Sequence, residues 1–133
     1  MDQTFGKSYK LCSRKLIAEL FKTGSNIRQY PFSIQWKEAE GLEKPFQMVI
    51  SAPKRQFRRA HDRNRIKRLM REAIRMNKLI LEESLVANNK QLALFVIYTS
   101  KEELPLSQLL KKSEQLFRKL IAEIANESTT DKS

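Results

Sequence analysis

The chain has 133 residues, of which 41% are hydrophobic, so it can bury one core but has no room for a second. No apolar run approaches the eighteen or more residues of a membrane-spanning helix, which excludes an integral membrane protein with helical spans. A net charge of +11 and a pI near 10.0 favour a polyanionic partner, either a nucleic acid or an acidic membrane surface.

The first half of the chain predicts one helix followed by two strands. Residues 13–23 place apolar side chains on one helical face, with Ser13 as N-cap and Gly24 as the stop. Residues 29–37 alternate apolar and polar side chains, which indicates a half-buried strand whose beginning, at Pro31, lies at a sheet edge. A turn at 38–44 leads to a second strand at 46–52, and we expect the two strands to form an antiparallel hairpin.

The second half predicts a helix, a strand and a final helix. Asp62 can cap a helix that starts at Arg63 and buries a face running from Ile66 to Ile74. Residues 91–99 are almost all apolar, as in a central strand covered on both faces. Residues 106–126 have helical spacing, and residues 127–133 form a flexible tail beyond a single domain at 1–126. The order α-β-β-α-β-α predicts an α+β fold with helices packed on a small sheet.

Most of the excess charge lies in one fifth of the chain. Residues 54–78 carry a net charge of +9, whereas residues 1–53 carry +3 and residues 79–133 carry −1. Cations packed this densely repel one another, so the arrangement lowers stability unless an anion binds there.

The sequence RNRIKRLMREAIR at residues 63–75 contains five arginines and one lysine against one acid. On a helix, the side that faces away from the core carries a row that we call the basic stripe: Asn64, Lys67, Arg68, Arg71 and Arg75. Arg63, at the core boundary, and three of these cations follow one another at i,i+4 spacing, where like charges destabilise a helix. Arginine suits bidentate phosphate contacts, and Asn64 adds a hydrogen-bonding amide. Polyanion binding is therefore favoured over a merely solvated surface.

Other functions fit the pattern less well. A membrane-bound helix needs its apolar face free for lipid, but here that face must cover the sheet. A DNA-binding regulator is disfavoured because no short helix precedes this one in a helix-turn-helix arrangement. The lone Cys12 and lone His61 cannot form an internal disulfide or a four-ligand zinc site, and we predict neither catalytic residues nor metal ligands. The N-terminus lacks a signal peptide, so we expect a cytoplasmic protein.

The motif at Arg63, Asn64, Arg65, Ile66, Lys67 and Arg68 closely resembles the signature of the bacterial ribonuclease P protein family. The resemblance covers most of the chain: the first helix ending in LFKTG, a strand ending at Ser51 before Lys54 and Arg55, the strand LALFVIY and a final amphipathic helix come in the family's order. An alternative is a ribosomal or other structural RNA-binding protein that uses the same basic helix.

The resemblance implies a two-layer α/β sandwich like ribosomal protein S5 domain 2, with a left-handed βαβ crossover. It implies a non-catalytic subunit that assists a catalytic RNA, with Mg²⁺ held chiefly by the RNA, in removing the 5′ leader of precursor tRNA. It assigns eight residues to contact with the ribonuclease P RNA: Lys54, Arg55, Arg63, Asn64, Arg65, Lys67, Arg68 and Arg71. We add Arg75, because it lies in the basic stripe.

A cleft between the first helix and the sheet is implied to bind the leader through Ile17, Phe21, Ser33 and Gln35. Ile17 and Gln35 stand where the family often has aromatic side chains, on which bases can stack.

Overall fold

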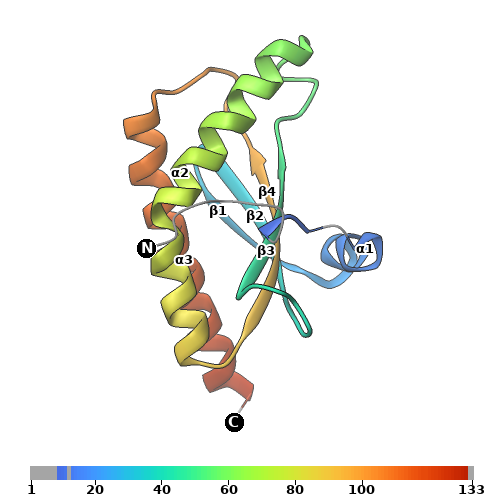
Figure 1. Cartoon of the computed structure of the whole chain (residues 1–133), viewed down its shortest axis with the longest axis vertical. Coiled ribbons are helices and arrows are strands. Elements are labelled where there is room, and N and C mark those ends of the chain that lie inside the picture. Colours follow the sequence, from blue (N-terminus) through green and yellow to red (C-terminus); the bar gives the residue numbers. More distant parts are fainter. Residues whose placement is uncertain (1–8, 12, 132–133) are drawn as a thin grey trace.

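The computed structural model describes residues 9–11 and 13–131, with side chains described as far as Ala125 in the last helix. The elements are α1 (Arg14–Thr23), β1 (Ser25–Gln29), β2 (Phe32–Ala39), β3 (Phe46–Ser51), α2 (Ala60–Ala87), β4 (Gln91–Tyr98) and α3 (Leu106–Asp131). Helices α2 and α3 lie side by side on one face of the sheet, and α1 lies on the opposite face (Figure 1). The predicted α+β sandwich is confirmed, with one more strand than expected.

Helix α1 begins and ends as its sequence predicts. The Ser13 side chain accepts a hydrogen bond from the Leu16 backbone N–H at 3.2 Å, which caps the first turn. Gly24 follows the last turn, where a Cβ atom would lie 2.4 Å from the Leu20 carbonyl oxygen. Any larger residue would therefore push the start of β1 away from the helix.

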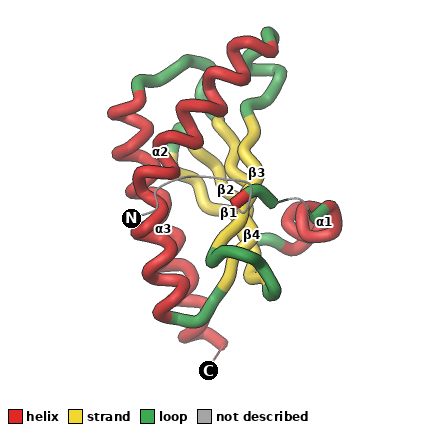
Figure 2. Tube along the Cα trace, viewed as in Figure 1, coloured by secondary structure: helices red, strands yellow, loops and turns green. Residues whose placement is uncertain are grey.

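The predicted hairpin between β2 and β3 is wrong. The strand order is β1-β2-β4-β3: β2 pairs antiparallel with β1 and β4, and β3 pairs parallel with β4 (Figure 2). The hairpin in the sheet joins β1 to β2, with Pro31 in its turn, so β2 is an interior strand and not an edge. The sequence hid β1 because Ile27 is its only apolar residue, as suits an edge strand with one solvated face.

The predicted start of α2 is also wrong. The helix begins at Ala60 with Arg59 in the N-cap position, and Asp62 lies in its first turn, where a carboxylate still interacts favourably with the helix dipole. In Figure 1, β3 and β4 both run upward with α2 to their left, and β4 lies behind β3. The β3-α2-β4 crossover is therefore left-handed, as the family resemblance implied, against the usual right-handed rule.

The main core lies between the sheet and the two long helices. Strand β4 is central, as predicted, and it ends at Tyr98, one residue before the predicted end. One set of its alternating side chains enters the main core with Leu94 and Val96, and the other packs under α1 with Ala93 and Phe95. This division leaves α1 to cover one part of the second face.

The end of the chain is helical for longer than expected. Helix α3 continues through residues 127–131, beyond the predicted end at residue 126. The flexible tail at residues 127–133 stays a prediction, with residues 132–133 outside the described part of the chain. Cys12, predicted to have no disulfide partner, also lies outside it.

Candidate nucleic-acid interface

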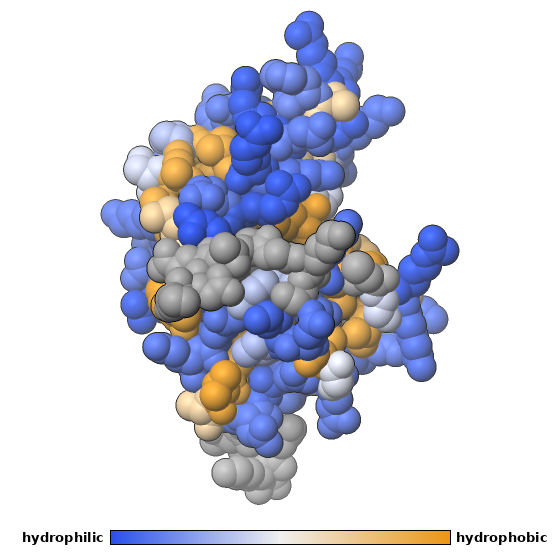
Figure 3. Space-filling model, viewed as in Figure 1, coloured by the Kyte–Doolittle hydropathy of each residue, from blue (hydrophilic) through white to orange (hydrophobic). Residues whose placement is uncertain are grey.

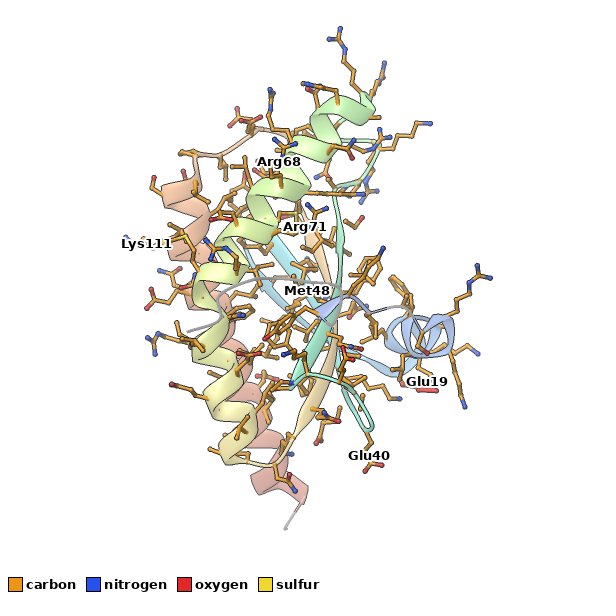
Figure 4. All side chains as sticks on the ribbon, in the orientation of Figure 1. Glu19, Glu40, Met48, Arg68, Arg71 and Lys111 are labelled. Atoms are coloured by element: carbon orange, nitrogen blue, oxygen red, sulfur yellow. The ribbon has the colours of Figure 1, made fainter. Side chains whose placement is uncertain are left out.

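The N-terminal half of α2 is fixed by its buried side. Ile66, Met70, Ala73 and Ile74 are at most 1% exposed and belong to the main core. The opposite side carries the basic stripe, in which Asn64, Arg68 and Arg71 are exposed and Lys67 and Arg75 are half-buried. Figure 3 shows hydrophilic side chains gathered over this end of the molecule, and Figure 4 shows Arg68 and Arg71 along α2 above Met48 of β3.

Several of the predicted RNA-binding cations have no anionic neighbour. Among the residues that the structure describes, no acid forms an ion pair with a group of five cations: Lys54, Arg55, Lys67, Arg68 and Arg71. Lys54 and Arg55 are exposed in the loop between β3 and α2. This part of the surface therefore keeps its full positive charge and its mutual repulsion, which a polyanion would relieve.

The two arginines at the start of the motif have neighbours within the chain. Arg63 donates hydrogen bonds from one guanidinium nitrogen to the carbonyl oxygens of Phe57 at 3.0 Å and Arg58 at 2.9 Å. The Arg65 Nε donates to Glu103 Oε1 at 2.6 Å. Arg63 thus braces the loop that leads into α2, and Arg65 ties α2 to the loop that precedes α3.

The C-terminal end of the basic stripe is partly neutralised. Arg75 Nη2 lies 2.5 Å from Glu72 Oε1, and its Nε donates to Glu72 Oε2 at 3.2 Å. The hydrogen bonds from Arg75 hold the pKa of the Glu72 carboxyl below its ordinary value, and the pKa of Arg75 is raised by the same contact. The strongest repulsion therefore lies between Lys67, Arg68 and Arg71.

The four residues predicted for the leader cleft lie on the α1 side of the sheet. Antiparallel register places Gln35 opposite Phe95 and Ser33 opposite Ile97, so these side chains share one face. Phe21 of α1 lies over Phe95, with ring centroids 4.9 Å apart.

Packing and hydrogen bonds position the residues predicted for the leader cleft. The half-buried Ile17 packs against the small core under α1. Asn26 of β1 donates hydrogen bonds to Ser33 Oγ at 3.2 Å and to the Ile34 carbonyl oxygen at 3.3 Å. The Gln35 Oε1 atom is buried and has no hydrogen-bond partner among the described residues.

Sequence analysis missed two residues on this face. Phe95 lies in a strand that reads as uniformly apolar, and only the sheet register shows that it points toward α1. Arg28 is exposed on the overlooked strand β1 and pairs in register with Ser33, which puts a cation at the edge of the same face. Alternation along β4 places Phe95 on the same face as Ala93, but it does not tell which face α1 covers.

A hollow on another part of the surface has a mainly acidic lining. It measures about 860 Å³, and its charged lining residues are Glu19, Glu38, Glu40, Glu43, Lys44 and Lys90, with Lys90 paired to Glu38 at 3.1 Å. Figure 4 shows Glu40 at the opposite end of the molecule from Arg68. Four carboxylates against two lysines leave this lining net negative, so the excess positive charge of the molecule lies toward α2.

Two further properties concern other classes of site. The described residues contain no group of three or more His, Cys, Asp or Glu side chains placed to hold a metal ion. No helix within the described ranges is long and apolar enough to cross a membrane.

Comparison with known proteins identifies the family. A profile of the family Ribonuclease P matches residues 5–121. The ribonuclease P protein component of Porphyromonas gingivalis is 34% identical over 116 residues, which make up 84% of this chain and 83% of the relative. The protein of the same name from Nitrosococcus oceani is 35% identical over 63 residues, or 47% of this chain and 51% of the relative.

Solved structures of the same family share the fold. The RNase P protein of Staphylococcus aureus has a TM-score of 0.65 and 20% identity, with 90% of this chain and 96% of that chain covered. The Thermotoga maritima RNase P protein has a TM-score of 0.67 and 21% identity, with 83% and 96% covered. The family profile and the relatives found by sequence favour ribonuclease P over the ribosomal alternative. The chain belongs to the ribonuclease P protein family, the protein component of the ribonucleoprotein that processes the 5′ end of tRNA.

Proposed function

We propose that the basic stripe, together with Lys54 and Arg55, binds the catalytic RNA subunit. The observation that carries this proposal is that Lys67, Arg68 and Arg71 form no ion pair with an acid among the described residues, on a helix whose other side is fixed in the core. Binding of RNA to such a surface is favourable, because the phosphates relieve the repulsion between the cations and counterions are released from the RNA. Arginine forks and the Asn64 amide can also hydrogen-bond phosphate and sugar oxygens.

The protein's part in the reaction is electrostatic and positional. In this proposal the RNA subunit carries the cleavage chemistry and holds Mg²⁺, as the family membership suggests. The cations reduce the repulsion between two polyanions, the RNA subunit and the precursor tRNA, and so lower the Mg²⁺ concentration that their association requires. We place this reaction in the cytoplasm.

The α1 side of the sheet is our candidate for the site that binds the single-stranded 5′ leader. Phe21 and Phe95 offer ring surface for base stacking, and Ser33 and Gln35 offer polar groups beside it. Arg28, at the edge of this face, can contact a phosphate of the leader. Without aromatic side chains at Ile17 and Gln35, stacking would depend on the Phe21 and Phe95 pair.

Reconstitution tests this function. The purified protein is combined with the ribonuclease P RNA of the organism that encodes it, and 5′ cleavage of precursor tRNA is measured at low Mg²⁺. We expect cleavage to rise well above that of the RNA alone. No gain over the RNA alone, with binding to ribosomal subunits instead, would contradict the proposal.

A further inference from the structure

We infer that Glu103 competes with RNA phosphate for Arg65 and thereby limits the affinity of α2 for the RNA subunit. This inference rests on the proposed function of α2. It separates Arg65, which must release an internal carboxylate before it can bind a phosphate, from the cations of the motif that can bind RNA directly.

The contacts of Arg65 occupy the edge that a phosphate would use. Its Nε lies 2.6 Å from Glu103 Oε1, and its Nη2 lies 3.7 Å from Asp62 Oδ1. These two nitrogens form one of the edges through which a guanidinium binds a phosphate or carboxylate with two parallel hydrogen bonds. One cation therefore faces two carboxylates, and the local charge of the three groups is −1.

The position of Glu103 is fixed by its neighbours and not by its own side chain. The hydroxyl of the buried Tyr98 donates to the Glu102 carbonyl oxygen at 2.6 Å and accepts from the Leu104 N–H at 3.1 Å. Ser100 Oγ accepts from the Glu102 N–H at 3.0 Å. The loop thus holds the Glu103 backbone on both sides and directs a carboxylate at α2.

Arg63 shows the contrast within the same motif. Its partners are two neutral carbonyl oxygens, at 2.9 and 3.0 Å, so the bonds fix the side chain without cancelling its charge. The partners of Arg65 are instead carboxylates, which cancel its charge.

The Arg65–Glu103 pair remains open to exchange. The side chains are 51% and 41% exposed, so water screens the pair and its net strength is small. An RNA phosphate and Glu103 therefore compete for the same edge of Arg65, so this arginine contacts phosphate in only part of the bound complexes. The affinity of the protein for RNA should then be lower than its full set of cations allows.

Binding to the ribonuclease P RNA over a series of salt concentrations tests this inference. Glu103→Gln removes the competing charge, and Glu102→Gln changes the net charge equally at the adjacent, exposed position, whose side chain has no described partner. We expect Glu103→Gln to bind about two- to fivefold more tightly. Its plot of log affinity against log salt should be steeper by up to about 0.7 to 0.9, the value for one complete added phosphate contact. Glu102→Gln should leave the slope unchanged.

A double-mutant cycle assigns the effect to the pair. In an Arg65→Ala background, Glu103→Gln should no longer change the slope. Equal effects of the two glutamine variants, an effect that persists without Arg65, or weaker binding by Glu103→Gln would each overturn the inference while leaving the role of α2 intact. Failure of the unaltered protein to bind the RNA at all would instead overturn the proposed function.

Discussion

Phe21 of α1 packs edge-on against Phe95 of β4, with ring centroids 4.9 Å apart and an interplanar angle of 64°. Phe21 is 55% exposed, so much of its ring faces solvent while Phe95 holds it in place. Because the Phe21 ring is already held in place, its side chain loses little conformational entropy when a base stacks on it.

Phe21→Ala should weaken binding of precursor tRNA with a long leader and leave binding of a substrate with a one-nucleotide leader unchanged. We expect the holoenzyme to lose about 1 to 3 kcal/mol of affinity for the long leader, the contribution of one stacked base. Val86→Ala is the control, because Val86 is 67% exposed on the C-terminal part of α2. Equal losses for long and short leaders would argue against leader binding at Phe21.

Phe117→Ala should destabilise the fold without a direct effect on the RNA-binding surface. Phe117 is fully buried on α3 and packs against Phe46 of β3, with ring centroids 6.3 Å apart. Its removal leaves a cavity, and we expect a loss of about 3 to 5 kcal/mol in the free energy of unfolding. Urea unfolding measures this loss, and a change below about 1 kcal/mol would contradict the packing described for the core.

Tyr98→Phe should lower the free energy of unfolding at neutral pH by about 1 to 3 kcal/mol, because the Leu104 N–H and the Glu102 carbonyl oxygen lose their partner. Burial raises the pKa of the folded Tyr98 hydroxyl above its ordinary value of 10.0. The stability that Tyr98 adds is thus complete below pH 10 and is lost as the pH rises through the folded pKa.

The gap in unfolding free energy between the unaltered protein and Tyr98→Phe should therefore narrow above pH 10. Denaturant unfolding at a series of pH values follows this gap, because other groups titrate equally in both proteins. A gap that stays constant to pH 11 would show that Tyr98 keeps its ordinary pKa.

The elements predicted best from the sequence were those with a long run or a regular spacing of apolar residues. Helix α2 and strand β4 were found because each has a strong apolar signal, with Ile66 and Met70 in one and Leu94 and Val96 in the other. Strand β1 was missed because a solvated edge strand needs only one buried side chain, Ile27. Without β1, the nearest partner for β2 was β3, and the wrong hairpin followed.

The candidate site was predictable in its composition but not in its internal contacts. The helical period was enough to place Arg68 and Arg71 on the exposed side of α2. The contact between Arg65 and Glu103 joins residues 38 positions apart, and nothing in the local pattern indicates it. Phe95 likewise required the sheet register, because alternation within a uniformly apolar strand does not reveal which face is which.

The most direct test of the central claim is the salt dependence of binding to the ribonuclease P RNA. Arg68→Ala and Arg71→Ala are compared with Arg118→Ala, a cation on α3 that is 64% exposed and paired with Glu114. We predict that each α2 variant binds more weakly and flattens the plot of log affinity against log salt by about 0.7 to 0.9, while Arg118→Ala keeps the original slope. Unchanged slopes for both α2 variants would show that this side of α2 does not contact RNA phosphate.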